Sequence, residues 1–157
     1  MLYGISGAPI PGGLPYASQI ASACATRNFP PCLAYAIAWR ETITIEGTSL
    51  CPNAATFIAS DGGHGLCQLT ASFPDDWMNP IANAGYAIDN FLVLALNYWH
   101  GLHGYSGDTL MLLVAATYNE GLGAAEKYHA SGDVDAGTTD EYGHGVLQKY
   151  RELAGEP

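Results

Sequence analysis

Basic side chains are scarce in this sequence: five lysines and arginines stand against fifteen aspartates and glutamates, for a formal net charge of −10. Proteins that bind nucleic acids neutralise phosphates with clusters of Lys and Arg. The sequence contains no such cluster, so we expect no nucleic-acid partner. The same negative charge repels an anionic membrane surface, and we expect no membrane partner either.

A long uninterrupted apolar run is also missing. The most apolar stretch, residues 86–99, contains one Asp and two Asn and is too short to span a bilayer, so it is predicted to be a core helix. Residues 1–16 are rich in Gly and Pro and have neither the basic nor the apolar region of a signal peptide. We interpret them as an extended arm, or the remnant of a linker, in front of a single domain at residues 17–157.

The alternation of apolar and polar residues that is typical of β-strands is absent as well, whereas helical spacing recurs along the chain. Asp108 is predicted to cap a helix that begins at Thr109, and the stretch from Gly47 to Gly65 is predicted to be irregular. Helices are expected at about residues 18–27, 32–45, 66–71, 81–102, 109–120, 124–130 and 142–153. The sequence therefore predicts an all-α domain of six or seven helices.

The four cysteines form an even set that allows two disulfides in three possible pairings. Their order suggests the pairs Cys24–Cys32 and Cys51–Cys67, each of which would close a short loop. The alternative is that some of them are buried as small apolar residues. Because no signal peptide is recognised, the sequence does not indicate whether the protein folds in an oxidising or a reducing compartment. Both alternatives therefore stand.

Glu41 lies on the apolar face of the predicted helix at 32–45, because it follows Ile37 by four residues and Leu33 by eight. A carboxyl group at that place faces the core or the wall of a cleft. Removal from water disfavours its charged form and raises its pKa, as a general acid at neutral pH requires. The alternative is a buried ion pair with Arg40, although adjacent helix residues diverge by about 100°.

Five short segments carry a recognisable order of motifs. They are Ala36–Thr42 with Glu41, Gly65-Leu66-Cys67-Gln68-Leu69-Thr70, Asn79-Pro80-Ile81-Ala82-Asn83, Ala115–Gly121 with Tyr118 and Asn119, and Tyr142 with Val146. In this order, over about residues 32–150, they resemble the motifs of the lytic transglycosylase and goose-type lysozyme superfamily (SLT-like domains). Three features depart from that pattern: Thr42 replaces a Ser, Cys67 replaces a Met, and the gap between Glu41 and Gly65 is longer than in many transglycosylases.

The resemblance implies a lysozyme-like all-α fold whose helices surround a substrate cleft, and an enzyme that degrades bacterial peptidoglycan. Glu41 would donate a proton to the β-1,4 glycosidic oxygen between N-acetylmuramic acid and N-acetylglucosamine. The N-acetyl group of the substrate would then assist at the anomeric carbon, so that no protein nucleophile is needed. In a lytic transglycosylase the Glu next deprotonates the muramic 6-hydroxyl and a 1,6-anhydro ring closes, whereas in a goose-type lysozyme an activated water attacks. No cofactor is implied, and we expect a monomer.

Asp61 bears on the choice between these two reactions. It lies close to the position at which goose-type enzymes carry an Asp thought to hold the attacking water. The alternative is that Asp61 caps a turn, as Asp before Gly often does.

The other motif residues have binding roles implied by the resemblance. Gln68 would line the cleft, Tyr118 and Asn119 would close it near the acid, and Tyr142 would hydrogen-bond Glu41 and tune its pKa. For both tyrosines the alternative is ordinary core packing. Outside the motifs, Phe73 and Trp77 are candidates either for stacking on sugar rings or for anchoring their loop.

Some residues of the sequence also allow other functions. His64 with Cys67 could indicate a cysteine peptidase, and His64 with Cys67 and Cys51 a zinc site, but neither pair-wise spacing nor a family signature supports them. A chitinase on the same fold and a non-catalytic wall-binding module are the remaining alternatives. A phage lysin, a virion component or a secreted enzyme would each act on the bacterial cell wall and fit the missing signal peptide.

Overall fold

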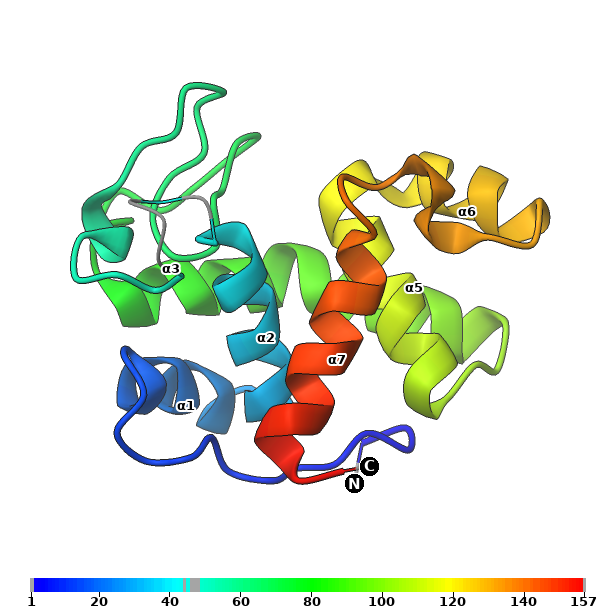
Figure 1. The fold of residues 1–157 in the computed structure, drawn as a ribbon, viewed down its shortest axis with the longest axis horizontal. Coiled ribbons are helices and arrows are strands. Elements are labelled where there is room, and N and C mark those ends of the chain that lie inside the picture. The colour runs from blue at the N-terminus through cyan, green and yellow to red at the C-terminus, as the bar shows by residue number, and fades with distance from the viewer. Residues whose placement is uncertain (1, 44, 46–48, 157) are drawn as a thin grey trace.

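The computed structural model describes residues 2–43, 45 and 49–156, and these form a helical domain (Figure 1). No named strand occurs among them, and the only pairings of strand type are isolated bridges, Leu2 with Ile5 and His64 with both Ile58 and Leu69. The all-α prediction is confirmed. The α-helices are α1 (Ala17–Ala25), α2 (Pro31–Glu41), α3 (Pro80–Ala87), α4 (Val93–Leu96), α5 (Gly107–Glu120), α6 (Leu122–Ala130) and α7 (Tyr142–Ala154).

Helix α2 lies at the centre of the domain, packed against α1 on one side and α7 on the other (Figure 1). Its residues from Cys32 to Ala38 are all buried, as expected of a helix that is apolar on every side. The alanines at 34, 36 and 38 allow its neighbours to approach closely. Helix α7 packs in turn against α5, so that α2, α7 and α5 form the frame of the molecule.

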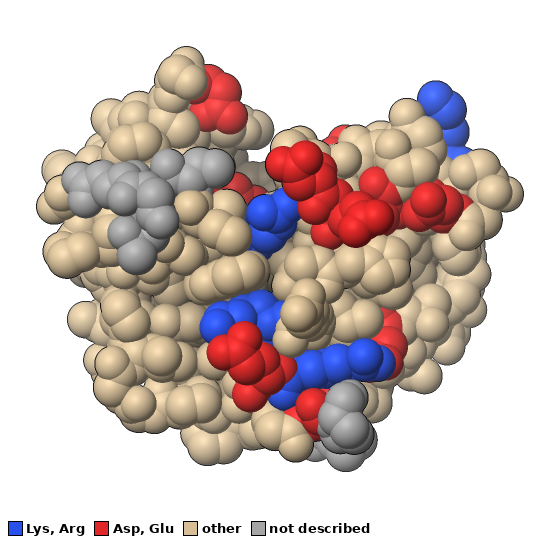
Figure 2. Space-filling model, viewed as in Figure 1, with Lys and Arg blue, Asp and Glu red and all other residues tan. Residues whose placement is uncertain are grey.

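Two lobes rise from this frame. One consists of the irregular chain between α2 and α3, and the other of α6 with the 3₁₀ segment Val134–Gly137 (Figure 1). The surface is hollowed between them, and acidic side chains gather on the α6 side of the hollow (Figure 2). None of the described helices is long and apolar enough to cross a membrane.

The N-terminal segment is extended and packs on the domain. Ile5 is fully buried in the core, the backbone N–H of Ser6 donates to the Tyr150 hydroxyl at 2.8 Å, and Gly107 N–H donates to the Tyr3 carbonyl at 3.1 Å. Residues 3–6 thus pack against α5, α7 and the core.

Helix α2 ends at Glu41, four residues earlier than predicted. The Thr42 hydroxyl turns back to donate to the Ala38 carbonyl at 2.9 Å and accepts a hydrogen bond from Leu50 N–H at 2.8 Å. This second bond ties the chain to the following loop and stops the helix. Residue 44, which the predicted helix included, lies outside the described residues.

Two further helix predictions need correction. Residues 66–71 form a turn and an antiparallel bridge instead of a helix. Helix α5 begins one residue before Asp108, whose carboxylate pairs with Arg151 and does not cap the helix. The long helix predicted at 81–102 is present as a continuous helical run, but Ile88–Leu92 and Asn97–Leu102 within it are π-helical.

All four cysteines are buried free thiols, so neither suggested disulfide is formed. Cys32 lies in α2 with its Sγ directed at the carbonyl oxygens of Ala8 and Pro9, at 3.3 and 3.6 Å. Burial raises the pKa of the Cys24 thiol to about 12. The cysteines therefore serve as small apolar core residues, the alternative left open above.

Candidate active site

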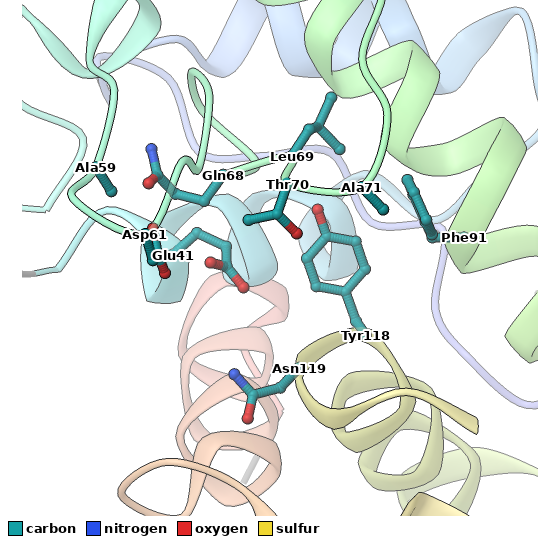
Figure 3. Close-up of a pocket in the computed structure, with 10 residues that line it drawn as sticks. All are labelled: Glu41, Ala59, Asp61, Gln68, Leu69, Thr70, Ala71, Phe91, Tyr118 and Asn119. Atoms are coloured by element: carbon teal, nitrogen blue, oxygen red, sulfur yellow. The ribbon is translucent and has the colours of Figure 1, made fainter. Parts of the chain in front are cut away.

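A hollow of about 270 Å³ lies between the two lobes and is open to solvent. It is lined by residues that come from the end of α2, the loop between α2 and α3, the π-helical segment and the end of α5 (Figure 3). These residues are Glu41, Ala59, Asp61, Gln68, Leu69, Thr70, Ala71, Phe91, Tyr118 and Asn119. Three of the five predicted motif segments thus meet at one place.

Glu41 is the last residue of α2, and its side chain points into the hollow (Figure 3). The hydroxyl of Tyr142, in the first turn of α7, donates to Glu41 Oε1 at 2.6 Å. Burial raises the pKa of Glu41 from 4.5 to about 7, an effect reinforced by the Asp61 carboxylate and opposed by the Tyr142 hydrogen bond and the Arg40 charge. A substantial share of the carboxyl group is therefore protonated at neutral pH and most of it below, as a proton donor requires.

Gln68 reaches the hollow from a tight turn. The backbone of Gln68 is left-handed, with φ of 47°, and its Nε2 donates to the Gly65 carbonyl at 2.7 Å. Buried Asn83 on α3 fixes the turn: its Oδ1 accepts from Cys67 N–H at 2.9 Å and its Nδ2 donates to the His64 carbonyl at 3.0 Å. A Cβ on Gly65 would lie 2.5 Å from Asn83 Nδ2, so only glycine fits there. The motifs at 65–70 and 79–83 are therefore two halves of one structure.

We expect Asn83→Ala to lower the free energy of unfolding by about 2–4 kcal/mol, because it leaves the buried N–H of Cys67 unpaired and removes one of the two hydrogen bonds to the His64 carbonyl. Urea denaturation followed by circular dichroism measures the change. The control is Asn90→Ala, which removes an exposed bond to the Tyr86 carbonyl and should cost less than about 0.5 kcal/mol. Equal losses in the two variants would contradict the role given to Asn83.

Tyr118 and Asn119 border the hollow from the end of α5 (Figure 3). The Tyr118 hydroxyl donates to the Cys67 carbonyl at 2.5 Å, which links α5 to the turn that carries Gln68. Its ring meets Phe91 edge to face, with centroids 6.0 Å apart. Asn119 is exposed, and its Oδ1 accepts from Thr139 N–H at 3.2 Å. Both residues thus lie at the wall of the hollow that Glu41 also lines.

Asp61 shares the hollow with Glu41 (Figure 3) and is exposed to solvent. Its Oδ1 accepts a hydrogen bond from Gly63 N–H at 3.1 Å, the contact of an Asx turn. The side chain thus caps a turn, and its carboxylate also acts electrostatically on Glu41.

Phe73 and Trp77 do not line the hollow. Both pack on His64: the Phe73 ring stacks on it with centroids 3.9 Å apart, and the Trp77 ring meets it edge to face at 4.9 Å. Both side chains thus pack against His64.

The cysteine-peptidase and zinc alternatives find no support in the described part of the chain. No group of three or more His, Cys, Asp or Glu there is placed to hold a metal ion. Burial raises the pKa of the Cys67 thiol well above its usual range, which disfavours the thiolate that a nucleophile needs. His64 is held in its aromatic stack with Nδ1 3.3 Å from the Leu69 carbonyl.

Thr70 and Phe91 line the hollow but were not assigned by sequence reasoning. Phe91 is not on the apolar helix face that α-helical spacing predicts for this segment. It belongs to the π-helical segment Ile88–Leu92, where each turn holds an extra residue and the facing of side chains shifts. No local sequence signal marks such a segment. Thr70 stands at the end of the Gly65–Thr70 motif, and that position was the available signal.

The structure is similar to that of an inactive mutant of the lytic transglycosylase Slt from Pseudomonas aeruginosa in which a Glu is replaced by Gln. The TM-score is 0.51 at 15% sequence identity, over 88% of this chain and 23% of that chain. The chain thus spans under a quarter of the length of the protein it matches. No protein-family model and no curated protein sequence matches it. The predicted SLT-like, lysozyme-like fold is confirmed.

Proposed function

We propose that this chain cleaves the glycan strands of bacterial peptidoglycan with Glu41 as its catalytic acid and base. The observation that carries the proposal is the Glu41 carboxyl in an open hollow, with its pKa raised to about 7 and its Oε1 held by Tyr142. The inactivity of the Slt mutant with a Glu-to-Gln replacement is in keeping with a reaction that depends on one such group.

The reaction begins when protonated Glu41 donates its proton to the glycosidic oxygen and the bond to the anomeric carbon breaks. The oxygen of the substrate's N-acetyl group closes on that carbon, so that the leaving sugar departs as an alcohol. Glu41, now a carboxylate, takes the proton of the muramic 6-hydroxyl as this oxygen attacks the anomeric carbon. The bond between the N-acetyl oxygen and the anomeric carbon breaks as a 1,6-anhydro ring forms, and the N-acetyl group stays on its sugar. Glu41 is then protonated again for the next cycle.

Hydrolysis is the second candidate, because the Asp61 carboxylate lines the same hollow as Glu41. A water held by Asp61 would replace the muramic hydroxyl as attacking group. The two reactions leave different ends on the glycan, a 1,6-anhydro sugar or a reducing sugar.

The test is digestion of purified bacterial walls, followed by turbidity and by mass spectrometry of the soluble products. We expect clearing of the suspension and anhydro-muropeptides. Glycol chitin, assayed in parallel, should stay undegraded, and its preferential cleavage would indicate a chitinase. No turnover of either polymer would contradict the proposal and favour a wall-binding module.

Asp61→Asn separates the two roles of Asp61. Transglycosylation needs no held water, so we expect this variant to keep its rate of wall clearing within about threefold and its anhydro products, with Oδ1 still accepting from Gly63 N–H. A loss of about 10²-fold or more, together with reducing-end products in the wild type, would assign Asp61 to the attacking water. Mass spectrometry identifies the products, and turbidity gives the initial rate of wall clearing.

A further inference from the structure

Asp135, in the 3₁₀ segment Val134–Gly137, is a buried carboxylate that the reaction above does not use; it is 6% exposed. Its Oδ1 accepts from Gly143 N–H at 2.8 Å and from the Thr138 hydroxyl at 2.7 Å. Its Oδ2 accepts from His144 N–H at 2.7 Å and lies 2.6 Å from His144 Nδ1. These donors hold the pKa of Asp135 below its usual value against the effect of burial, so it is ionised at neutral pH. A buried charge needs such partners.

The first turn of α7 depends on this carboxylate. The residue before the helix, Glu141, gives it no side-chain cap, and Asp140 and Glu141 both have left-handed backbones, with φ of 51° and 53°. Such conformations are unfavourable for residues with a Cβ and persist only where surrounding contacts enforce them. Asp135 supplies the missing cap from outside the helix. A Cβ on Gly143 would lie 2.8 Å from Asp135 Oδ1, so glycine is required for this approach.

Tyr142 is tied into the same network through its backbone. Thr138 Oγ1, which donates to Asp135, accepts a hydrogen bond from Tyr142 N–H at 3.0 Å. On the opposite side, Arg40 Nη2 donates to the carbonyls of Thr139 and Asp140 at 3.1 and 2.9 Å. The start of α7 is thus held from both sides, while the Tyr142 hydroxyl reaches Glu41 Oε1.

We propose that Asp135 is a positioning residue for the active site: through Thr138 and the first turn of α7 it holds the Tyr142 hydroxyl on Glu41. The inference rests on the proposed role of Glu41 as the catalytic group. It assigns a function in catalysis to a residue that contacts neither the hollow nor Glu41.

The protonation of Glu41 reports on this positioning. The Tyr142 hydrogen bond lowers the pKa of Glu41, so its loss should raise that pKa. Removal of the negative charge of Asp135 would by itself act in the opposite direction. The groups that face Glu41 are Arg40, Asp61, Cys67, Tyr118 and Tyr142, and those that face Asp135 are Glu120, Thr138 and His144.

The experiment follows the side-chain carboxyl carbon of Glu41 by carbon-13 NMR during a pH titration of the full chain, with Glu41→Gln to assign the signal. We expect Tyr142→Phe and Asp135→Ala each to raise the pKa of Glu41 by about half a unit or more. The double variant should raise the pKa no further than Tyr142→Phe alone, because Asp135 acts through Tyr142. An unchanged or lowered pKa in Asp135→Ala, or shifts that add in the double variant, would overturn the proposal.

If Asp135→Ala does not fold, Thr138→Val tests the same proposal. It removes the link between Asp135 and Tyr142 N–H but preserves side-chain shape, and it too should raise the pKa of Glu41; an unchanged pKa overturns the proposal. Glu152→Gln, which removes the charge of an exposed carboxylate near the other end of α7, is the control and should leave the titration unchanged. Wall clearing is measured alongside. An inactive wild type would refute the proposed function, whereas the titration alone judges the role of Asp135.

Discussion

Glu41→Gln is expected to reduce the rate of glycan cleavage by at least about 10³-fold. The amide keeps the shape of the side chain and can still accept the Tyr142 hydrogen bond, but it has no proton of suitable acidity to give to the glycosidic oxygen. Among the described residues that line the hollow, Asp61 is the other carboxyl group, and it is exposed and bonded to Gly63 N–H. Release of soluble muropeptides from purified walls, quantified by mass spectrometry, measures the loss.

The matched control is Glu152→Gln, the same chemical change at an exposed position of α7 where the carboxylate pairs with Lys149. It should clear walls at the wild-type rate. Circular dichroism of both variants shows whether the fold is retained. A folded Glu41→Gln protein that keeps more than about a tenth of the wild-type rate would remove Glu41 from the role of general acid.

The parts of the site that could be predicted are those encoded in local spacing and in contiguous motifs. The repeat of Leu33, Ile37 and Glu41 places a carboxyl group on the apolar side of its helix, and the structure has it at the wall of the hollow. The contact between Tyr142 and Glu41 joins residues 101 positions apart and could be anticipated only because the family resemblance paired them. Helical period alone predicts which way a side chain points, not what it meets.

The misplaced features depend on contacts between distant segments. Residues 66–71 look helical in isolation, yet Asn83 accepts from Cys67 N–H and so holds the chain in a turn. Helix α2 stops early because Leu50 N–H bonds the Thr42 hydroxyl. Asp135 stands in an acidic, Gly-rich stretch that resembles an ordinary solvated loop, and nothing in its neighbours along the chain signals burial.

The same Glu41→Gln change is expected to stabilise the protein, by an amount that grows above pH 4.5 and is largest above neutral pH. The pKa of Glu41 is about 7 in the folded state against an ordinary value of 4.5. Below pH 4.5 the group is protonated in folded and unfolded chains alike and has no effect on stability. Between those values the unfolded chain ionises first, so the wild type loses stability as pH rises. Above pH 7 the loss is complete, at about 3 kcal/mol for a shift of this size.

An amide at position 41 does not ionise, so Glu41→Gln should exceed the wild type in free energy of unfolding by about 3 kcal/mol at pH 8.5 and match it near pH 4. Urea denaturation at the two pH values gives the difference, and titration of Asp135 and the other carboxyls cancels because both proteins share them. Glu152→Gln should differ from the wild type by less than about 1 kcal/mol at either pH, since its carboxylate is exposed. If the Glu41→Gln advantage were the same at both pH values, Glu41 would have an ordinary pKa. The carboxyl group would then be ionised at neutral pH. It could not act as the proton donor, and its ionisation would not lower the free energy of unfolding.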